Sequence, residues 1–253
     1  MKLGLALSGG GARGIAHLGM MQVMEEVGLK PDLLAGTSAG AIGAALYAHG
    51  YSPQEIMEII RDTRLMNIIR PAWTIRGLLG FDKVGEKLKE YLPEDDFGVL
   101  KIPLTVAATQ IRTGEVRYFS QGPLIRAILA SSCIPVVFSP IVIDGEDYMD
   151  GGVSDNLPAS VLREEADVVI GMHCNPIERN FKSRSAKDMI ERSLLLAISN
   201  ATYAQSGICD LFLDPPALAA YKVFDFGKAE EIFKIGEDYA RENIAKFEAI
   251  AKQ

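Results

Sequence analysis

The sequence has few of the residues that hold small extracellular or metal-dependent folds together. Its three cysteines, Cys133, Cys174 and Cys209, are far apart and form no C-x-x-C pair, which argues against a disulfide framework or a zinc cluster. No stretch approaches the roughly 18 uninterrupted apolar residues of a membrane-spanning helix. The apolar run at the N-terminus breaks at Gly9, too soon for a secretory signal. We therefore expect an unprocessed, soluble, cytoplasmic protein.

Positive charge is also scarce. The chain of 253 residues has 26 lysines and arginines against 33 aspartates and glutamates, a formal net charge of −7. Nucleic acids and anionic membranes are usually bound by basic surfaces, so this balance argues against a nucleic-acid-binding protein and leaves only a local basic patch open. Hydrophobic residues make up 48% and charged residues 23%, which excludes disordered and collagen-like chains. Since no linker or repeat interrupts the sequence, we expect one domain over residues 1–253.

Apolar runs that fit strands alternate with segments of helical periodicity. This alternation predicts an α/β protein whose sheet has parallel members. The expected strands are at 3–7, 33–35, 102–108, 116–119, 141–143, 148–149 and 168–172, and the expected helices at 15–27, 39–49, 53–63, 123–130, 159–165, 185–206 and 228–252.

The first glycine-rich turn spans residues 9–14 and reads Gly-Gly-Gly-Ala-Arg-Gly. It fits the dinucleotide fingerprint G-x-G-x-x-G, and it lies between an expected strand and an expected helix, as that fingerprint requires. The acidic ribose ligand should end the second strand, whereas Asp32 precedes that strand. Taken alone, the turn fits three alternatives: a nucleotide or anion site, an oxyanion hole, or a tight strand-helix connection.

The second glycine-rich turn, Gly36-Thr37-Ser38-Ala39-Gly40, favours the oxyanion hole. A serine centred in G-x-S-x-G between a strand and a helix is typical of a nucleophile elbow, whose flanking glycines allow a sharp turn. Acyl transfer also needs backbone N–H donors for the tetrahedral oxyanion, and a neighbouring glycine turn supplies them because its backbone can approach closely. We expect these donors at Gly9, Gly10 and Gly11, with the Ala39 N–H beside them.

A serine nucleophile needs a general base, and the chain has three histidines. His17 lies in the first expected helix, and His49 lies about three turns from Ser38 along the second. His173 ends a strand and follows Asp150 in the order Ser, Asp, His that α/β-hydrolases use, so it is the histidine that fits a triad. Asp150 is the alternative base, because a carboxylate in a partly dry site has a raised pKa and can take the proton directly.

Three blocks resemble, in order and spacing, the signature of the patatin-like phospholipases. They are Gly9 to Gly14, Gly36 to Gly40 and Asp150-Gly151-Gly152. Residues 130–135 and 156–158 are similar to further family segments, so the similarity covers residues 3–175. Residues 176–253, which have a helical pattern, carry no motif that we can place.

The resemblance implies a patatin-like three-layer sandwich, with a mainly parallel central sheet flanked by helices, and a catalytic dyad without histidine. By position, Ser38 is the nucleophile and Asp150 the base. The first block supplies the oxyanion hole through the amides of Gly10 and Gly11, and Arg13 matches the basic position of that block. The implied reaction is hydrolysis of fatty-acyl esters of phospholipids or lysophospholipids, with a lipid acyl ester as partner and with no metal or other cofactor.

One segment between the second and third blocks is basic in an otherwise acidic chain. From Arg61 to Lys83 there are five basic and two acidic residues, together with the only tryptophan, Trp73. Such a segment fits a lid over residues 64–82 that touches phosphate headgroups in peripheral membrane contact, and it fits an excursion packed in the core or in a dimer equally well.

Two hypotheses from other functional classes stay open. A nucleotide-binding oxidoreductase would use the turn at residues 9–14 and would leave Ser38 and Asp150 unexplained. A non-catalytic lipid-binding or regulatory module would keep the fold, but the presence of both Ser38 and Asp150 argues against it.

Overall fold

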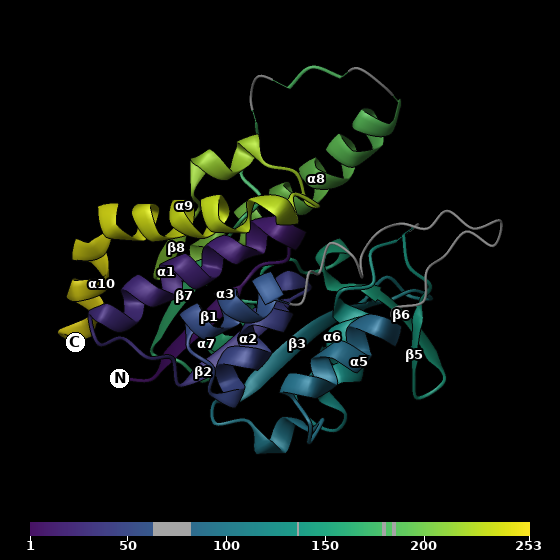
Figure 1. Cartoon of the computed structure of the whole chain (residues 1–253), viewed down its shortest axis with the longest axis horizontal. Coiled ribbons are helices and arrows are strands. Elements are labelled where there is room, and N and C mark those ends of the chain that lie inside the picture. Colours follow the sequence, from purple (N-terminus) through teal and green to yellow (C-terminus); the bar gives the residue numbers. More distant parts are fainter. Residues whose placement is uncertain (63–81, 136, 179–180, 184–185) are drawn as a thin grey trace.

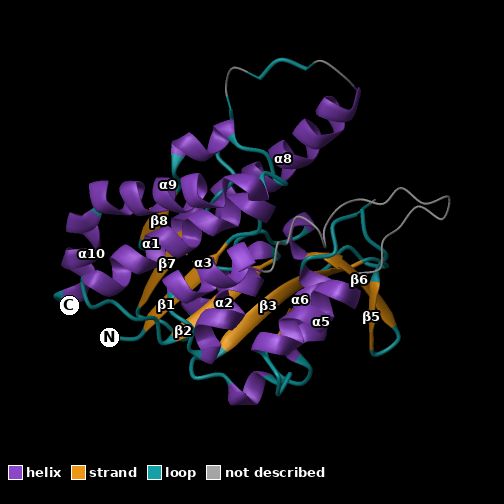
Figure 2. Ribbon diagram, viewed as in Figure 1, coloured by secondary structure: helices purple, strands orange, loops and turns teal. Residues whose placement is uncertain are grey.

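The computed structural model describes residues 1–62, 82–135, 137–178, 181–183 and 186–253. In this part of the chain, a central sheet of eight strands has the order β5-β6-β3-β2-β1-β7-β8, with β4 also paired to β3 (Figure 2). The pairs from β3 to β8 along this order are parallel, and β4, β5 and β6 pair antiparallel. The strands are β1 (Leu3–Leu7), β2 (Leu33–Thr37), β3 (Leu104–Gln110), β4 (Val116–Phe119), β5 (Ile141–Ile143), β6 (Glu146–Asp150), β7 (Val168–Met172) and β8 (Leu211–Leu213).

Helices cover both faces of the sheet, so the predicted α/β fold with a central sheet flanked by helices is confirmed (Figure 1). The larger core lies under α1, α2, α3, α5, α6 and α9, whereas the opposite face is covered by the short α7. The helices are α1 (Ile15–Glu26), α2 (Ala39–His49), α3 (Pro53–Asp62), α5 (Asp82–Tyr91), α6 (Leu124–Ser131), α7 (Ser160–Arg163), α8 (Ala186–Gln205), α9 (Ala229–Glu242) and α10 (Ile244–Ala251).

Strand β1 presents large side chains to one face of the sheet and small ones to the other. Successive side chains of a strand point to opposite faces. Leu3, Leu5 and Leu7 enter the larger core, whereas Gly4 and Ala6 face α7. A Cβ atom on Gly4 would lie 3.1 Å from the Cβ of Leu162 in α7. Small residues on this face therefore let α7 pack close to the backbone of the sheet.

The C-terminal part of the chain belongs to the same core. Helix α9 lies along α1 (Figure 1), with Gly19 of α1 and Gly236 of α9 at the crossing. A Cβ on Gly236 would overlap the backbone of Ala16, so glycine is required for this close approach. The single-domain organisation stays a prediction.

Most predicted elements are confirmed, one predicted helix is divided, and two elements were not predicted. The helix expected at 228–252 is divided into α9 and α10 at Asn243. Helix α5 and strand β8 were not predicted. The segment 64–82, for which a lid and a packed excursion fit the sequence equally well, lies almost entirely outside the described residues, which resume at Asp82. Within the described ranges, no helix combines the length and the apolar character needed to cross a membrane.

Candidate active site

Strand β3 brings the second and third sequence blocks together. It lies between β2 and β6, with Thr37 of β2 opposite Ala107 and Asp150 of β6 opposite Ala108. Because Ala107 and Ala108 are consecutive, the ends of β2 and β6 meet at one point of the sheet edge. The approach is tight there, since a Cβ on Gly151 would overlap the carbonyl oxygen of Ala107. Residues 112 positions apart in the chain therefore become neighbours.

Ser38 occupies the sharp turn between β2 and α2. Its backbone has φ 53° and ψ −122°, a conformation that residues other than glycine rarely adopt. The flanking glycines are required by close packing: a Cβ on Gly36 would lie 2.8 Å from the backbone of Ala41, and one on Gly40 would overlap the carbonyl of Leu7. The strained serine stands directly before the N-terminus of α2, where the helix dipole favours negative charge.

Ser38 and Asp150 are hydrogen-bonded to each other. The Ser38 hydroxyl donates to Asp150 Oδ2 at 2.8 Å, and the Gly152 N–H donates to Asp150 Oδ1 at 2.8 Å. Both side chains are buried. Burial disfavours the carboxylate and raises the pKa of Asp150 to about 6, although the bonds from Gly152 and Ser38 oppose the shift. The carboxyl group is therefore a stronger base than an exposed aspartate, and it remains largely ionised at neutral pH.

Ser131, at the end of α6, fixes the backbone of Ser38 by a hydrogen bond. The Ser38 N–H donates to Ser131 Oγ at 2.8 Å, and Ser131 Oγ donates to the carbonyl of Ala107 at 2.6 Å. The Ser131 hydroxyl thus connects the turn at Ser38 to β3, and the Ser38 N–H already has a hydrogen-bond acceptor. We did not single out Ser131 from the sequence. The available signal was its place in the segment 130–135 that is similar to the family.

The backbone of the first glycine turn divides into bonded and unbonded amides. The Gly9 N–H donates to the carbonyl of Asn156 at 3.1 Å, and the Ala12 N–H donates to the carbonyl of Val223 at 2.8 Å. Both acceptors lie far from the turn in sequence, and we did not assign them a role from the sequence. These bonds tie the turn to the segment after β6 and to the segment before α9.

The remaining amides of the two turns are available as donors. Among the residues that the structure describes, no acceptor bonds the N–H groups of Gly10, Gly11 and Ala39. The two turns are in contact, since a Cβ on Gly9 would lie 3.0 Å from the Cβ of Ser38 and one on Gly14 would lie 2.8 Å from that of Ala39. Amides without an acceptor beside a nucleophile are the donors that a tetrahedral oxyanion requires.

Arg13, expected at the basic position of the first block, is buried and directed toward the C-terminal segment. Its Nε donates to the carbonyl of Tyr221 at 2.7 Å, and its Nη2 donates to the same oxygen. Together with the bond between Ala12 and Val223, this contact fixes the start of α1 against residues 221–223.

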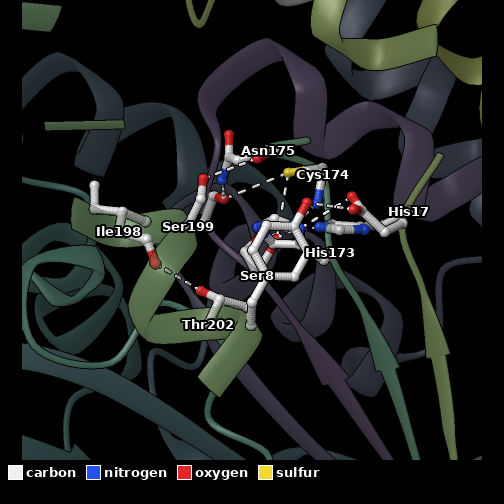
Figure 3. Close-up of polar contacts among 11 residues, drawn as sticks. Ser8, His17, His173, Cys174, Asn175, Ile198, Ser199 and Thr202 are labelled. Carbon is white, nitrogen blue, oxygen red and sulfur yellow. Dashed lines mark hydrogen bonds and ion pairs between the residues drawn. The ribbon is translucent and has the colours of Figure 1, made fainter. Parts of the chain in front are cut away.

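His173 and His17 make their hydrogen bonds to groups other than Ser38. His173 is fully buried, and its Nδ1 lies 3.0 Å from Asp214 Oδ1 (Figure 3). His17 Nε2 contacts the carbonyl of Ser8 at 2.9 Å, and burial lowers the pKa of His17 to about 4. Within the described part of the chain, Ser38 Oγ bonds Asp150 and no hydrogen bond joins it to a histidine. No cluster of His, Cys, Asp and Glu in the described residues could hold a metal ion.

Comparison with known proteins places these blocks in one family. The model of the patatin-like phospholipase family matches residues 5–163, which include both glycine turns, Ser38 and Asp150. An NTE family protein of Mycobacterium tuberculosis is 32% identical over 70% of this chain and 50% of its own length. Human patatin-like phospholipase domain-containing protein 6 is 26% identical over 94% of this chain and 20% of its own length. The chain thus spans about half the length of the mycobacterial relative, and less of the human one.

A solved structure shows the same fold. The crystal structure of VipD from Legionella pneumophila matches with a TM-score of 0.57 and 16% identity, over 97% of this chain and 67% of that one. The family that the three sequence blocks resemble is therefore confirmed by the comparison with the family model. The chain belongs to the patatin-like phospholipase family.

Proposed function

We propose that this chain is a serine lipid acyl hydrolase that cleaves fatty-acyl esters of phospholipids or lysophospholipids through a Ser38–Asp150 dyad. The observation that carries the proposal is the hydrogen bond of 2.8 Å between the hydroxyl of an elbow serine and a buried aspartate whose pKa is raised to about 6. This pair joins a nucleophile to a group that can accept its proton.

In the acylation step, Asp150 accepts the hydroxyl proton while Ser38 Oγ forms a bond to the acyl carbon of the ester. The negative charge that develops on the carbonyl oxygen is stabilised by the N–H groups of Gly10, Gly11 and Ala39. The tetrahedral intermediate collapses when the bond to the leaving alcohol breaks and Asp150 returns its proton to that alcohol. The product is an acyl ester of Ser38.

Deacylation repeats these steps with water as the nucleophile. Asp150 takes a proton from the water while the water oxygen attacks the acyl carbon. The same amides stabilise the second oxyanion. The proton then returns to Ser38 Oγ as the acyl bond breaks, which releases the fatty acid. The aspartate therefore acts alternately as base and acid, for which a pKa near 6 is well suited.

The names of the relatives support a lipid substrate. A yeast relative, 26% identical over 94% of this chain and 16% of its own length, is named as a lysophospholipase. We propose the same class of ester for this chain, with access by peripheral contact at a membrane surface. The three cysteines are unpaired, which is compatible with the reducing cytoplasm that we propose as its location.

A panel of phospholipids and lysophospholipids, assayed with the wild type and with Ser38→Ala, tests the proposal. We expect fatty-acid release by the wild type, no release by a folded Ser38→Ala variant, and labelling of Ser38 by a fluorophosphonate probe. A fully active Ser38→Ala variant, or labelling of Ser8 or Ser132 in its place, contradicts the nucleophile. A thermal shift with a dinucleotide, without hydrolysis of any ester, favours the oxidoreductase.

A further inference from the structure

A second group of buried polar residues lies on the other side of the first glycine turn from Ser38. It occupies the ends of β1 and β7 and is covered by α8 (Figure 3). Its members bond to one another and to nearby backbone carbonyls, and the proposed reaction uses none of their side chains. They are Ser8, His17, His173, Cys174, Asn175, Ser199 and Thr202.

The carbonyl of Gly9 receives two contacts from this group. Asn175 Nδ2 donates to it at 2.6 Å, and Cys174 Sγ lies 3.4 Å from the same oxygen. Burial raises the pKa of Cys174 to about 12, so the sulfur keeps its proton at neutral pH and can donate. The Gly9 carbonyl oxygen is therefore directed toward the residues that follow β7, and β7 lies on the opposite side of β1 from β2, which Ser38 follows.

The orientation of this carbonyl determines the orientation of the Gly10 amide. The two belong to one planar trans peptide, in which C=O and N–H point in opposite directions. With the carbonyl bonded to Asn175, the Gly10 N–H points to the side of the turn that faces Ser38. A peptide between two glycines rotates easily, since neither residue carries a Cβ. Rotated, it would direct a carbonyl oxygen at the developing oxyanion and repel it.

We propose that Asn175 is a positioning residue that holds the Gly9–Gly10 peptide in the orientation needed for the oxyanion hole. The inference rests on the proposed function, and it extends the catalytic arrangement to a residue beyond the 5–163 match of the family model. In the part of the chain that the structure describes, no hydrogen bond joins the Asn175 side chain to Ser38 or Asp150. It acts through the peptide that it bonds.

Two observations support a specific role for the Asn175 amide. Its Oδ1 is buried and has no hydrogen-bond partner among the described residues, although unpaired buried acceptors are rare and destabilising. The Asn175 side chain thus donates from Nδ2 to the Gly9 carbonyl, although this orientation leaves its Oδ1 without a donor from the described residues. In addition, Ser199 of α8 donates to the Asn175 carbonyl at 2.9 Å and fixes its backbone. This contact gives part of the C-terminal region, which carries no motif, a connection to the site.

The test compares Asn175→Ala and Asn175→Asp with Thr202→Val. Asn175→Ala removes the donor, and Asn175→Asp keeps the shape of the side chain but offers no donor when its carboxyl group is ionised. Thr202 is equally buried in the same group, but its hydroxyl bonds only the Ile198 carbonyl of its own helix, so Thr202→Val is the matched control. Steady-state kinetics with a soluble ester such as p-nitrophenyl butyrate give kcat and KM. Inhibition by a trifluoromethyl ketone, whose adduct with Ser38 carries an oxyanion, is compared with inhibition by the corresponding alcohol.

We expect both Asn175 variants to lose on the order of 10- to 100-fold in kcat, less than or similar to the loss of one oxyanion donor. KM should change by less than about twofold, because ground-state binding is retained. Affinity for the ketone should fall with kcat while affinity for the alcohol is retained, and Thr202→Val should resemble the wild type. An unchanged kcat in a folded Asn175→Ala variant, or an equal loss in Thr202→Val, overturns the proposal.

A crystal structure of Asn175→Ala or Asn175→Asp separates this inference from the proposed function. We expect the Gly9–Gly10 peptide to be rotated or to occupy two orientations. If the wild type hydrolyses no ester, the proposed function fails, and the peptide orientation in the variant still decides whether Asn175 positions it. An unrotated peptide in both variants overturns the positioning role, whatever the activity.

Discussion

Replacing Asp150 with asparagine tests the chemistry and the electrostatics of the site in one variant. Asparagine has nearly the same shape, and it can still accept from the Gly152 N–H and donate to Ser38 Oγ. It cannot accept the serine proton. We therefore expect folded Asp150→Asn to lose on the order of 10²- to 10⁴-fold or more in kcat/KM, the usual contribution of a general base.

The same substitution should stabilise the protein at alkaline pH. Burial raises the pKa of Asp150 from 3.8 to about 6, so the folded state binds the proton more tightly than the unfolded chain. The contribution of Asp150 to the free energy of unfolding is then most favourable below pH 3.8, and it is lost as the pH rises through 6. At about 1.4 kcal/mol for each pKa unit, the wild type loses about 2 to 3 kcal/mol between pH 4 and pH 8 at this residue.

Urea unfolding of both proteins at pH 4 and pH 8 measures this difference. Asparagine does not titrate, so Asp150→Asn should gain about 2 to 3 kcal/mol over the wild type between the two pH values. Ser38→Ala is the control: it keeps the carboxyl group but removes a hydrogen bond that lowers its pKa, so its stability relative to the wild type should fall as the pH rises. If the stability difference between Asp150→Asn and the wild type does not depend on pH, the raised pKa of Asp150 is refuted. If Asp150→Asn keeps near wild-type kcat/KM, the role of Asp150 as general base is refuted.

Three further predictions concern the oxyanion turn, the buried histidine and the pH profile. Gly10→Val, whose side chain would collide with Cys174, should lose on the order of 10²-fold in kcat; a rise in KM alone would instead make the turn a binding feature. His173→Ala leaves a cavity and removes the hydrogen bond to Asp214 Oδ1, although Asp214 Oδ2 still accepts from the Tyr203 hydroxyl, so thermal unfolding should show a loss of about 2–4 kcal/mol, while kcat persists at temperatures where the variant is folded. A loss of several orders of magnitude in folded His173→Ala would restore the triad. The acid limb of kcat/KM should have its midpoint at pH about 6 as Asp150 ionises, and a limb that persists unchanged in a residually active Asp150→Asn would assign it to another group.

The strands and helices that carry the sequence blocks could be predicted because their periodicity is local. Two elements were missed for different reasons. Strand β8 has three residues, too few for a period to be recognised. Helix α5 contains Gly85 and follows a segment interrupted by glycine and proline, although Val84 and Leu88, four residues apart, are both buried and gave a usable signal.

The parts of the candidate site that could be predicted from the sequence are those where close packing of the backbone requires glycine. The glycines around Ser38 and after Asp150 mark places where backbones meet, and this left a readable pattern. Asn175 left none, and Ser131 left only its place in the segment 130–135 that is similar to the family. Ser131 bonds the Ser38 amide 93 residues away, and Asn175 bonds the Gly9 carbonyl 166 residues away. Only the folded sheet shows that these groups are neighbours.

For the proposed dyad, the separation of 112 residues between Ser38 and Asp150 determines when activity can arise during translation. At about 5–20 residues per second, the ribosome adds the aspartate roughly 6 to 22 seconds after the serine. The contacts that hold the glycine turn come later still, from Asn175 and then from Tyr221 and Val223. With the proposed chemistry, a nascent or truncated chain therefore presents a serine without its base or a completed oxyanion hole. If the proposed hydrolysis takes place, it therefore begins only after the segment up to Val223 has been synthesised.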